Sequence, residues 1–285
     1  MKKSLALLLT LAMAFSLAAC GAKTEEAPQT TEEAVAEETT TEDAAAEETT
    51  TEDVATEETT TEETATEDVK SEGVMTYAEY AAAKLDTEVT VETYVQAKQS
   101  WWEDKATVYT QDKDGAYFLY EMACSEEDYA KLVPGTKIRV NGYKAEWAGE
   151  VEIIEATFEI LEGSYIAEAE DMTAMLASEE LVNHQNKFVA FKGMTVEASK
   201  DADGNDVAFL YNWDGSGEDG NDLYFNVSLD GQTYTFTVES YLCDNTTDVY
   251  AAVKNLQIGD VVDMEGFLYW YEGVNPHITS LTVVE

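Results

Sequence analysis

The sequence predicts a mainly β protein whose ordered part consists of two small five-stranded barrels that follow a disordered acidic tether. Two observations predict this class. Short runs that are rich in β-branched and aromatic residues, separated by turn residues, fill positions 85–162, and this pattern is typical of strands. The same order of elements returns at positions 185–285, and in both copies a glycine interrupts one strand at an equivalent place.

The first copy has the expected order β-β-β-α-β-β. The runs TEVTVETYVQAK, KATVYTQ and AYFLYEM predict three strands, with DKDG at 112–115 as a hairpin turn. Thr76 and Glu79 have the spacing of a helix capping box before the first strand, and Ser125 and Asp128 have it after the third. We therefore expect one short helix before the first strand and another before the fourth.

The repeat is clearest in the stretches GTKIRVNGYKAEWAG, residues 135–149, and GDVVDMEGFLYWYEG, residues 259–273. Each has glycines at seven-residue steps, and the alternation of apolar side chains changes phase at Gly142 and at Gly266. A glycine at such a phase change marks a bulge or a sharp bend, which allows a strand to coil around a barrel. The length of the repeat indicates a duplicated domain rather than a solenoid.

Five strands with a helix between the third and the fourth resemble the OB-fold, a small, partly open barrel. The resemblance covers residues 85–162 and 185–285, and we expect OB-like domains at 74–162 and 163–285. OB-folds bind oligonucleotides or oligosaccharides on one barrel face. A pair of Greek-key sandwiches is the alternative architecture.

The N-terminus, MKKSLALLLTLAMAFSLAACG, reads as a signal peptide, because a basic pair precedes an apolar stretch too short to span a bilayer. Its end, Leu17 to Cys20, resembles the lipobox of bacterial lipoproteins. The resemblance implies a surface lipoprotein, of the Gram-positive kind, whose residues 1–19 are removed and whose lipidated Cys20 anchors it to the outer face of the cell membrane. An ordinary cleaved signal peptide is the alternative.

Residues 20–73 predict a disordered linker. The motif EETTTE begins at Glu37, Glu47 and Glu57, and the segment has few large apolar side chains to bury. Its like charges repel, so it cannot offset the entropy of ordering. We expect a solvated tether, with binding of calcium or of a basic partner as the alternative.

The charge of the chain argues against nucleic acid as a partner. The formal net charge is −43, from 59 acidic and 16 basic residues, and Arg139 is the one arginine. Residues 74–162 hold 8 bases and 18 acids, net −10, and residues 163–285 hold 4 and 22, net −18. Such a chain repels polyanions, so we expect no nucleic-acid partner.

Aromatic residues provide the candidate ligand-binding site. We expect a non-catalytic binding lipoprotein that contacts a cell-wall or host glycan, or a peptide, through aromatic side chains. Packing inside a barrel or between the domains is the alternative interpretation of these rings. The candidate residues are Trp101, Trp102, Trp147, Tyr269, Trp270 and Tyr271.

An acidic loop at 200–222 suggests calcium as a possible cofactor, because its carboxylates are the ligands that this ion prefers. The candidate ligands are Asp201, Asp203, Asp206, Asp214, Asp219 and Asp222. A calcium-dependent structural or adhesion module is therefore an alternative function, and two hairpin turns are the plainer interpretation of the loop. No other cofactor is expected.

No catalytic motif occurs in the chain, so an extracytoplasmic enzyme is the weakest alternative. Cys124 and Cys243 come at equivalent places after the third strand of each copy. We expect both to be free thiols, buried or half-buried, with a disulfide between them as the alternative.

Overall fold

The computed structural model describes residues 70–284, which belong to one compact unit. Cys20, the expected signal peptide and residues 20–69 of the expected tether lie outside the described residues. Within 70–284, no helix is long and apolar enough to cross a membrane.

A short helix precedes the first barrel. The helix α1 (Tyr77–Ala82) begins with the expected capping box, in which the Thr76 hydroxyl accepts a hydrogen bond from the Glu79 backbone and the Glu79 carboxylate accepts one from the Thr76 backbone. At its other end, Lys144 Nζ donates to the carbonyl oxygens of Tyr80, Ala81 and Ala83 at 2.9–3.0 Å. These bonds satisfy carbonyl groups that a helix C-terminus leaves without partners.

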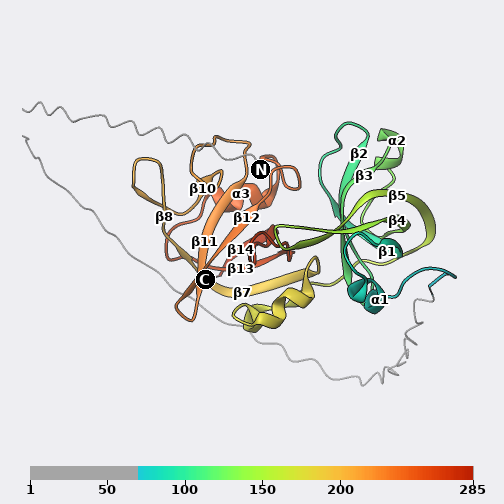
Figure 1. The fold of residues 1–285 in the computed structure, drawn as a ribbon. Coiled ribbons are helices and arrows are strands. Elements are labelled where there is room, and N and C mark those ends of the chain that lie inside the picture. Colours follow the sequence, from blue (N-terminus) through green and yellow to red (C-terminus); the bar gives the residue numbers. More distant parts are fainter. Residues whose placement is uncertain (1–69, 285) are drawn as a thin grey trace, which may run out of the picture. The chain divides into compact units, whose positions relative to one another are not determined.

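The first barrel is closed, with the strand order β1-β2-β3-β5-β4 and a final pairing of β4 with β1 (Figure 1). The short helix α2 lies between β3 and β4, as the sequence predicts. Closure of this sheet excludes the Greek-key sandwich. Its elements are β1 (Glu88–Lys98), β2 (Lys105–Gln111), β3 (Ala116–Ala123), α2 (Glu126–Tyr129), β4 (Thr136–Trp147) and β5 (Glu150–Ser164).

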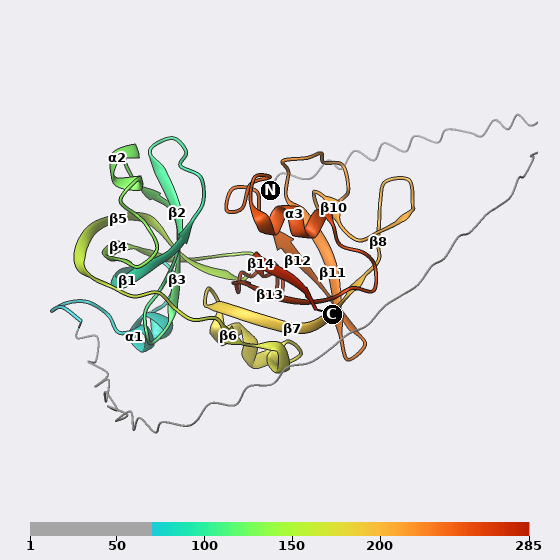
Figure 2. The ribbon, with the colours of Figure 1, turned by 180° about the vertical axis from the view of Figure 1, so that it is seen from behind.

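The second barrel repeats this topology. Its sheet has the order β10-β11-β12-β14-β13-β7-β6, and an additional pairing of β11 with β7 joins five of its strands into a ring. The helix α3 packs against β14 and β11, and both views place it at one end of this barrel (Figures 1 and 2). The main elements are β7 (Phe188–Glu197), β11 (Leu223–Leu229), β12 (Gln232–Val238), α3 (Asp248–Lys254), β13 (Val261–Phe267) and β14 (His277–Val284).

The second barrel also has several short helices and strands outside its five main strands. Two 3₁₀ helices separate β6 from β7, and a hairpin with a third short strand fills the long loop between β7 and β11. Their bounds are β6 (Glu170–Asp171), η1 (Thr173–Met175), η2 (Glu179–His184), β8 (Ser199–Lys200), β9 (Asp206–Val207) and β10 (Leu210–Tyr211).

The two glycines at the phase changes lie at bulges, as predicted. The register of β4 against β5 shifts between Asn141 and Tyr143, and that of β13 against β14 shifts between Glu265 and Gly266. A Cβ on Gly142 would lie 2.8 Å from the Ile154 carbonyl oxygen, and a Cβ on Gly266 would lie 2.7 Å from Ile278 Cα. The backbone of the neighbouring strand therefore approaches each glycine too closely for any side chain.

Each barrel has its own apolar core, and a third, smaller aromatic cluster joins the two. In this cluster Tyr109 of β2 stacks on Phe267 of β13 with ring centroids 4.3 Å apart, and Phe118 packs beside them. Hydrogen bonds reinforce the contact, among them the one from the Phe188 amide to Gln111 Oε1 at 2.7 Å. The two barrels are therefore held together by a packed and hydrogen-bonded boundary.

Both described cysteines are free and buried. Cys124 directly follows β3, whereas Cys243 lies five residues beyond the end of β12, so the two positions are less equivalent than the sequence suggested. Burial is the main cause that raises the pKa of Cys124 to about 11 and that of Cys243 to about 12.

Candidate functional site

A pocket lined by aromatic side chains lies where the β4–β5 turn of the first barrel meets the segment between β13 and β14 of the second. Its volume is about 560 Å³, which is within the usual range of small-molecule sites. The residues that line it are Trp147, Trp213, Tyr224, Thr237, Glu239, Tyr269, Tyr271, Asn275 and His277.

Trp147 is held by a tight turn. It pairs with Glu150 across the β4–β5 hairpin, and the two residues between them, Ala148 and Gly149, have φ of 51° and 93°. Two positive φ values match the twist of a two-residue hairpin and fix its register. The Trp147 side chain is 55% exposed, and its ring lies 5.2 Å from that of Tyr271.

A second turn positions the two tyrosines. The Tyr271 amide donates to the Gly273 carbonyl oxygen at 2.9 Å, and the Asn275 amide donates to that of Tyr269 at 3.0 Å. The Glu272 amide also donates to the Ala148 carbonyl oxygen at 2.7 Å. This bond links the two turns directly, so Trp147 and Tyr271 are held in a defined relation to each other.

His277 lies at the bottom of the pocket, and its imidazole ring is neutral. Its Nδ1 lies 2.9 Å from the Tyr109 hydroxyl, and the Tyr269 ring stacks on it at 4.3 Å. Burial lowers the pKa of His277 to about 3. The imidazole therefore carries one N–H donor and one acceptor over the whole physiological range of pH.

Glu239 is a buried carboxyl group that titrates near neutrality. Burial, followed by the nearby charge of Asp222, raises the pKa of Glu239 to about 7. Its Oε2 accepts a hydrogen bond from Gln99 Nε2 at 3.1 Å, and its Oε1 accepts one from the Tyr241 amide at 3.1 Å.

Asn275 is the third polar group at the bottom of the pocket. The Thr237 hydroxyl donates to its Oδ1 at 2.8 Å, which orients the amide group, so its nitrogen remains as a donor. No lysine or arginine is among the described residues that line this pocket. The site is thus a set of aromatic rings around uncharged or weakly charged hydrogen-bonding groups.

The structure brings together three of the six aromatic residues that the sequence singled out: Trp147, Tyr269 and Tyr271. Trp102 lines a neighbouring pocket. Trp101 is half-buried, and its Nε1 donates to the Cys124 carbonyl oxygen at 2.9 Å. Trp270 is also half-buried and packs against the core of the second barrel, so Trp101 and Trp270 have the packing role that was the alternative.

Sequence reasoning missed the other members of the pocket, above all Trp213 and His277. Trp213 is 75% exposed on the loop before β11, where the sequence drew attention to its acidic neighbours instead. His277 and Glu239 carry no motif. The sequence held no clear signal for Trp213, because single exposed apolar side chains are common on protein surfaces.

Five of the six candidate calcium ligands have a side-chain hydrogen bond or ion pair with a protein group. Asp201, Asp203 and Asp206 lie in or beside the β8–β9 turn, where Asp201 Oδ1 accepts bonds from the Asp203 and Asn205 amides at 3.0 and 2.8 Å, and Asp206 pairs with Lys200 at 2.7 Å. Between residues 70 and 284, no group of three or more His, Cys, Asp or Glu could hold a metal ion. The contacts of Asp201 and Asp206 are those expected from the alternative interpretation of the loop, two hairpin turns.

The remaining three acids of that loop also have partners. Asp214 Oδ1 accepts from the Ser216 amide at 3.0 Å, Asp219 pairs with Lys254 at 2.5 Å, and Asp222 Oδ1 accepts from the Ser240 hydroxyl at 2.6 Å. Such bonds stabilise turns and connect the loop to the barrel.

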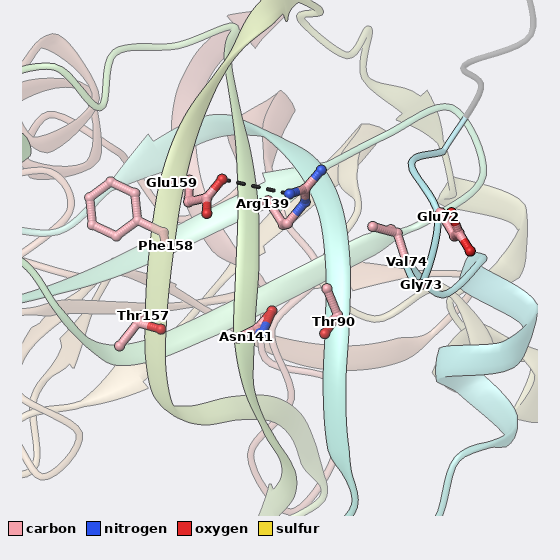
Figure 3. Close-up of a pocket in the computed structure, with 9 residues that line it drawn as sticks. All are labelled: Glu72, Gly73, Val74, Thr90, Arg139, Asn141, Thr157, Phe158 and Glu159. Atoms are coloured by element: carbon pink, nitrogen blue, oxygen red, sulfur yellow. Dashed lines mark ion pairs between the residues drawn. The ribbon is translucent and has the colours of Figure 1, made fainter.

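A second pocket, of about 390 Å³, lies on the outside of the first barrel and contains Arg139 (Figure 3). Arg139 Nη2 lies 2.9 Å from Glu92 Oε1, and its Nη1 lies 3.6 Å from Glu159 Oε2. Two carboxylates therefore face the guanidinium group. Since its charge is compensated, this pocket does not offer a site for an anion.

The fold defines the chain as a tandem OB-like protein. No protein-family model matches the sequence, and no curated protein matches it. Solved structures with similarity include "Crystal structure of the tetrameric p202 HIN2" (TM-score 0.30, 11% identity, 71% of this chain and 96% of that chain). "Structure of murine DNA binding protein bound with ds DNA" has a TM-score of 0.32 and 9% identity over 69% of this chain and 95% of that chain.

Another is "Crystal structure of Ifi202 HINa domain in complex with 20bp dsDNA", with a TM-score of 0.31 and 11% identity over 69% of this chain and 92% of that chain. The two titles that name double-stranded DNA contradict the expectations of a glycan or peptide ligand and of no nucleic-acid partner, and both are corrected here. The reason for the error is physical. Net charge describes the far field of a chain, whereas stacking of a base depends on a local surface.

Proposed function

We propose that this chain is a non-catalytic binding protein that takes a nucleobase into the aromatic pocket between its two barrels. The observation that carries the proposal is the arrangement of that pocket. Exposed rings of Trp147, Tyr271 and Trp213 surround hydrogen-bonding groups at the bottom of the pocket, which are uncharged or weakly charged. Aromatic rings bind nucleobases by stacking, which contributes about 1–3 kcal/mol per base.

The polar groups suit the edge of a base. A nucleobase presents donors and acceptors in its plane, and proteins read them through side-chain amides and carboxyl groups. Glu239, Asn275 and His277 supply both kinds of group at one end of the pocket. This combination supports a flat heterocycle with polar edges over a purely apolar ligand.

The electrostatics support recognition through the base and not through the phosphate. The pocket lining has no basic residue, and residues 163–285 hold 22 acids against 4 bases. Most nucleic-acid-binding proteins lose affinity as salt rises, because they release counterions from phosphates. Here, salt screens repulsion between the strand and the protein. We expect the affinity for a single strand to rise, or to stay constant, between low and moderate salt.

Calorimetric titration with adenosine, guanosine, cytidine and thymidine, and with a single-stranded decanucleotide, tests this function. Trp147→Ala and Trp213→Ala should each weaken binding roughly 5- to 150-fold, which corresponds to the loss of one stacking contact. Tyr143→Ala, an exposed ring outside the pocket, is the matched control and should bind like the unmodified protein. Absence of binding of every ligand, or equal affinities in the pocket variants and the control, would refute the proposal.

We also propose that the binding domains act outside the cytoplasm, on a lipid anchor. The support is the sequence alone, namely the signal-like N-terminus and the lipobox resemblance ending at Cys20. The length of the acidic segment would let the barrels reach ligands away from the membrane surface.

A further inference from the structure

Another pocket, different from the one that contains Arg139, adjoins the aromatic pocket. Its volume is about 450 Å³, and it lies between the start of β2 in the first barrel and the turn after β12 in the second. It shares three lining residues with the aromatic pocket, namely Glu239, Tyr269 and His277. The two pockets therefore meet at these side chains.

Trp102 and Tyr241 are the two most exposed aromatic residues among those that line this adjoining pocket. Trp102 is 67% exposed and Tyr241 is 66% exposed. Large apolar side chains that stay in contact with water do not gain the free energy of burial. A cluster of such exposed side chains marks a binding surface. Neither ring takes part in the aromatic pocket itself.

Backbone hydrogen bonds fix the segments that carry both rings. Trp102 and Lys105 exchange backbone hydrogen bonds of 3.2 and 2.9 Å around a turn in which Glu103 and Asp104 have φ of 46° and 60°. Two positive φ values define a tight hairpin turn. Tyr241 is fixed by its carbonyl oxygen, which accepts a bond from the Ser100 amide at 2.7 Å. The backbone segments that carry Trp102 and Tyr241 are thus close neighbours across the boundary between the barrels.

The adjoining pocket also contains the one basic residue that lines either pocket. Lys105 Nζ lies 2.5 Å from Glu121 Oε2, and both side chains are 43% exposed. An exposed ion pair contributes little stability, so Lys105 can turn from Glu121 to a phosphate at low energetic cost. A phosphate in the adjoining pocket would lie near the Lys105 ammonium group, whereas a phosphate in the aromatic pocket would have no lysine or arginine beside it.

From this juxtaposition we propose that the adjoining pocket is a second base subsite, and that the ligand has two bases joined by one phosphodiester. This inference rests on the proposed function of the aromatic pocket. One base occupies each pocket, Trp102 or Tyr241 stacks on the second base, and Lys105 contacts the linking phosphate. The ligand is thus a dinucleotide or two consecutive nucleotides of a single strand.

Calorimetric titrations with adenosine, with the dinucleoside monophosphate ApA and with a ten-residue oligoadenylate test the inference in the full chain. ApA should bind at least tenfold more tightly than adenosine. Trp102→Ala and Tyr241→Ala should reduce or remove this gain while leaving adenosine binding unchanged. Lys105→Gln should weaken ApA and the oligoadenylate but not adenosine. Trp147→Ala should weaken all three ligands, and Tyr143→Ala should weaken none.

The outcomes separate the two proposals. Equal affinities for adenosine and ApA, with adenosine binding still lost in Trp147→Ala, would overturn the second subsite and retain the first. No binding of any of the three ligands would overturn both. If the oligoadenylate binds much more tightly than ApA, the ligand spans more than two bases and the two-base limit is wrong.

Discussion

The Tyr109 hydroxyl of the first barrel lies 2.9 Å from Nδ1 of His277 in the second. Both residues are buried, and the pair lies between the aromatic cluster that joins the barrels and the base of the aromatic pocket. Burial raises the pKa of Tyr109 and lowers that of His277. Both partners are therefore neutral, and one hydrogen bond links the packing of the two domains to the site.

Tyr109→Phe should remove this bond while keeping the ring that stacks on Phe267. An unpartnered buried imidazole nitrogen costs about 1–3 kcal/mol, and urea unfolding should show this loss. Tyr117→Phe, which removes a buried hydroxyl that donates to Asp112 within the first barrel, is the control. If the pair orients His277, Tyr109→Phe alone should also weaken nucleoside binding. Equal nucleoside affinities in both variants would mean that the bond has only a structural role.

Gly142→Val and Gly266→Val should each destabilise the protein strongly. A Cβ at Gly142 would lie 2.8 Å from the Ile154 carbonyl oxygen, and one at Gly266 would meet the His277 and Ile278 backbone. A backbone cannot yield as a flexible side chain can, so we expect each variant to lose about 3 kcal/mol of stability, the upper end of the usual range for overpacking. Ser280→Val, exposed on β14, should change the unfolding midpoint little. Wild-type stability in both glycine variants would contradict the role assigned to the bulges.

The fold could be predicted because its signals are local. The phase change at Gly142 and its repeat at Gly266 mark bulges in the chain itself, and the capping residue Thr76 lies next to the helix that it begins. Strand alternation and turn residues then limit the topology to a few possibilities. Only the closure of each sheet required the structure.

The site could be predicted only in part, because it is assembled from distant segments. Alternation indicates that adjacent aromatic residues such as Trp101 and Trp102 point to opposite faces, but not which face is covered. Glu239 and His277 become unusual only through burial at the barrel boundary. The calcium site stays a prediction for a related reason, since carboxylates that cap turns and carboxylates that bind ions look alike in a sequence.

Cys20→Ser should release the protein from the membrane. In the proposed anchor, the Cys20 thiol is the attachment point of the lipid, and a serine hydroxyl does not replace it. Fractionation followed by a salt wash should find the unmodified protein with membranes and the variant in the soluble fraction. Ser4→Ala, within the expected signal peptide, is the control. A variant that stayed with the washed membranes would exclude lipidation at Cys20.

Glu150 should make the protein less stable as pH rises from about 5 to 8. Its side chain is fully buried where the barrels meet, and Oε2 accepts a hydrogen bond from the Trp270 amide at 2.9 Å. Burial is the main cause that raises its pKa from an ordinary value of 4.5 to about 8. Glu150 Oε1 and Asn186 Oδ1 both lack a hydrogen-bond partner within residues 70–284, and a proton on the carboxyl group would supply a donor.

The sign of the effect follows from proton binding. Below pH 4.5 the carboxyl group is protonated in the folded and the unfolded state, and the stability linked to the raised pKa is fully present. Between 4.5 and 8 only the unfolded chain releases the proton, so stability falls as pH rises through this window. The full difference corresponds to at most about 5 kcal/mol.

Glu150→Gln tests this assignment, because an amide keeps an acceptor for the Trp270 backbone and adds a permanent donor. Urea unfolding at pH 5, 6.5 and 8 should show a steep fall for the unmodified protein and a shallower one for the variant. Glu152 and Glu239, whose pKa values burial also raises to about 7, account for the remaining slope. Glu146→Gln, an equal charge change at an exposed position of β4, should leave the pH dependence as it is. Parallel curves for Glu150→Gln and the unmodified protein would show that Glu150 does not hold a proton in the folded state.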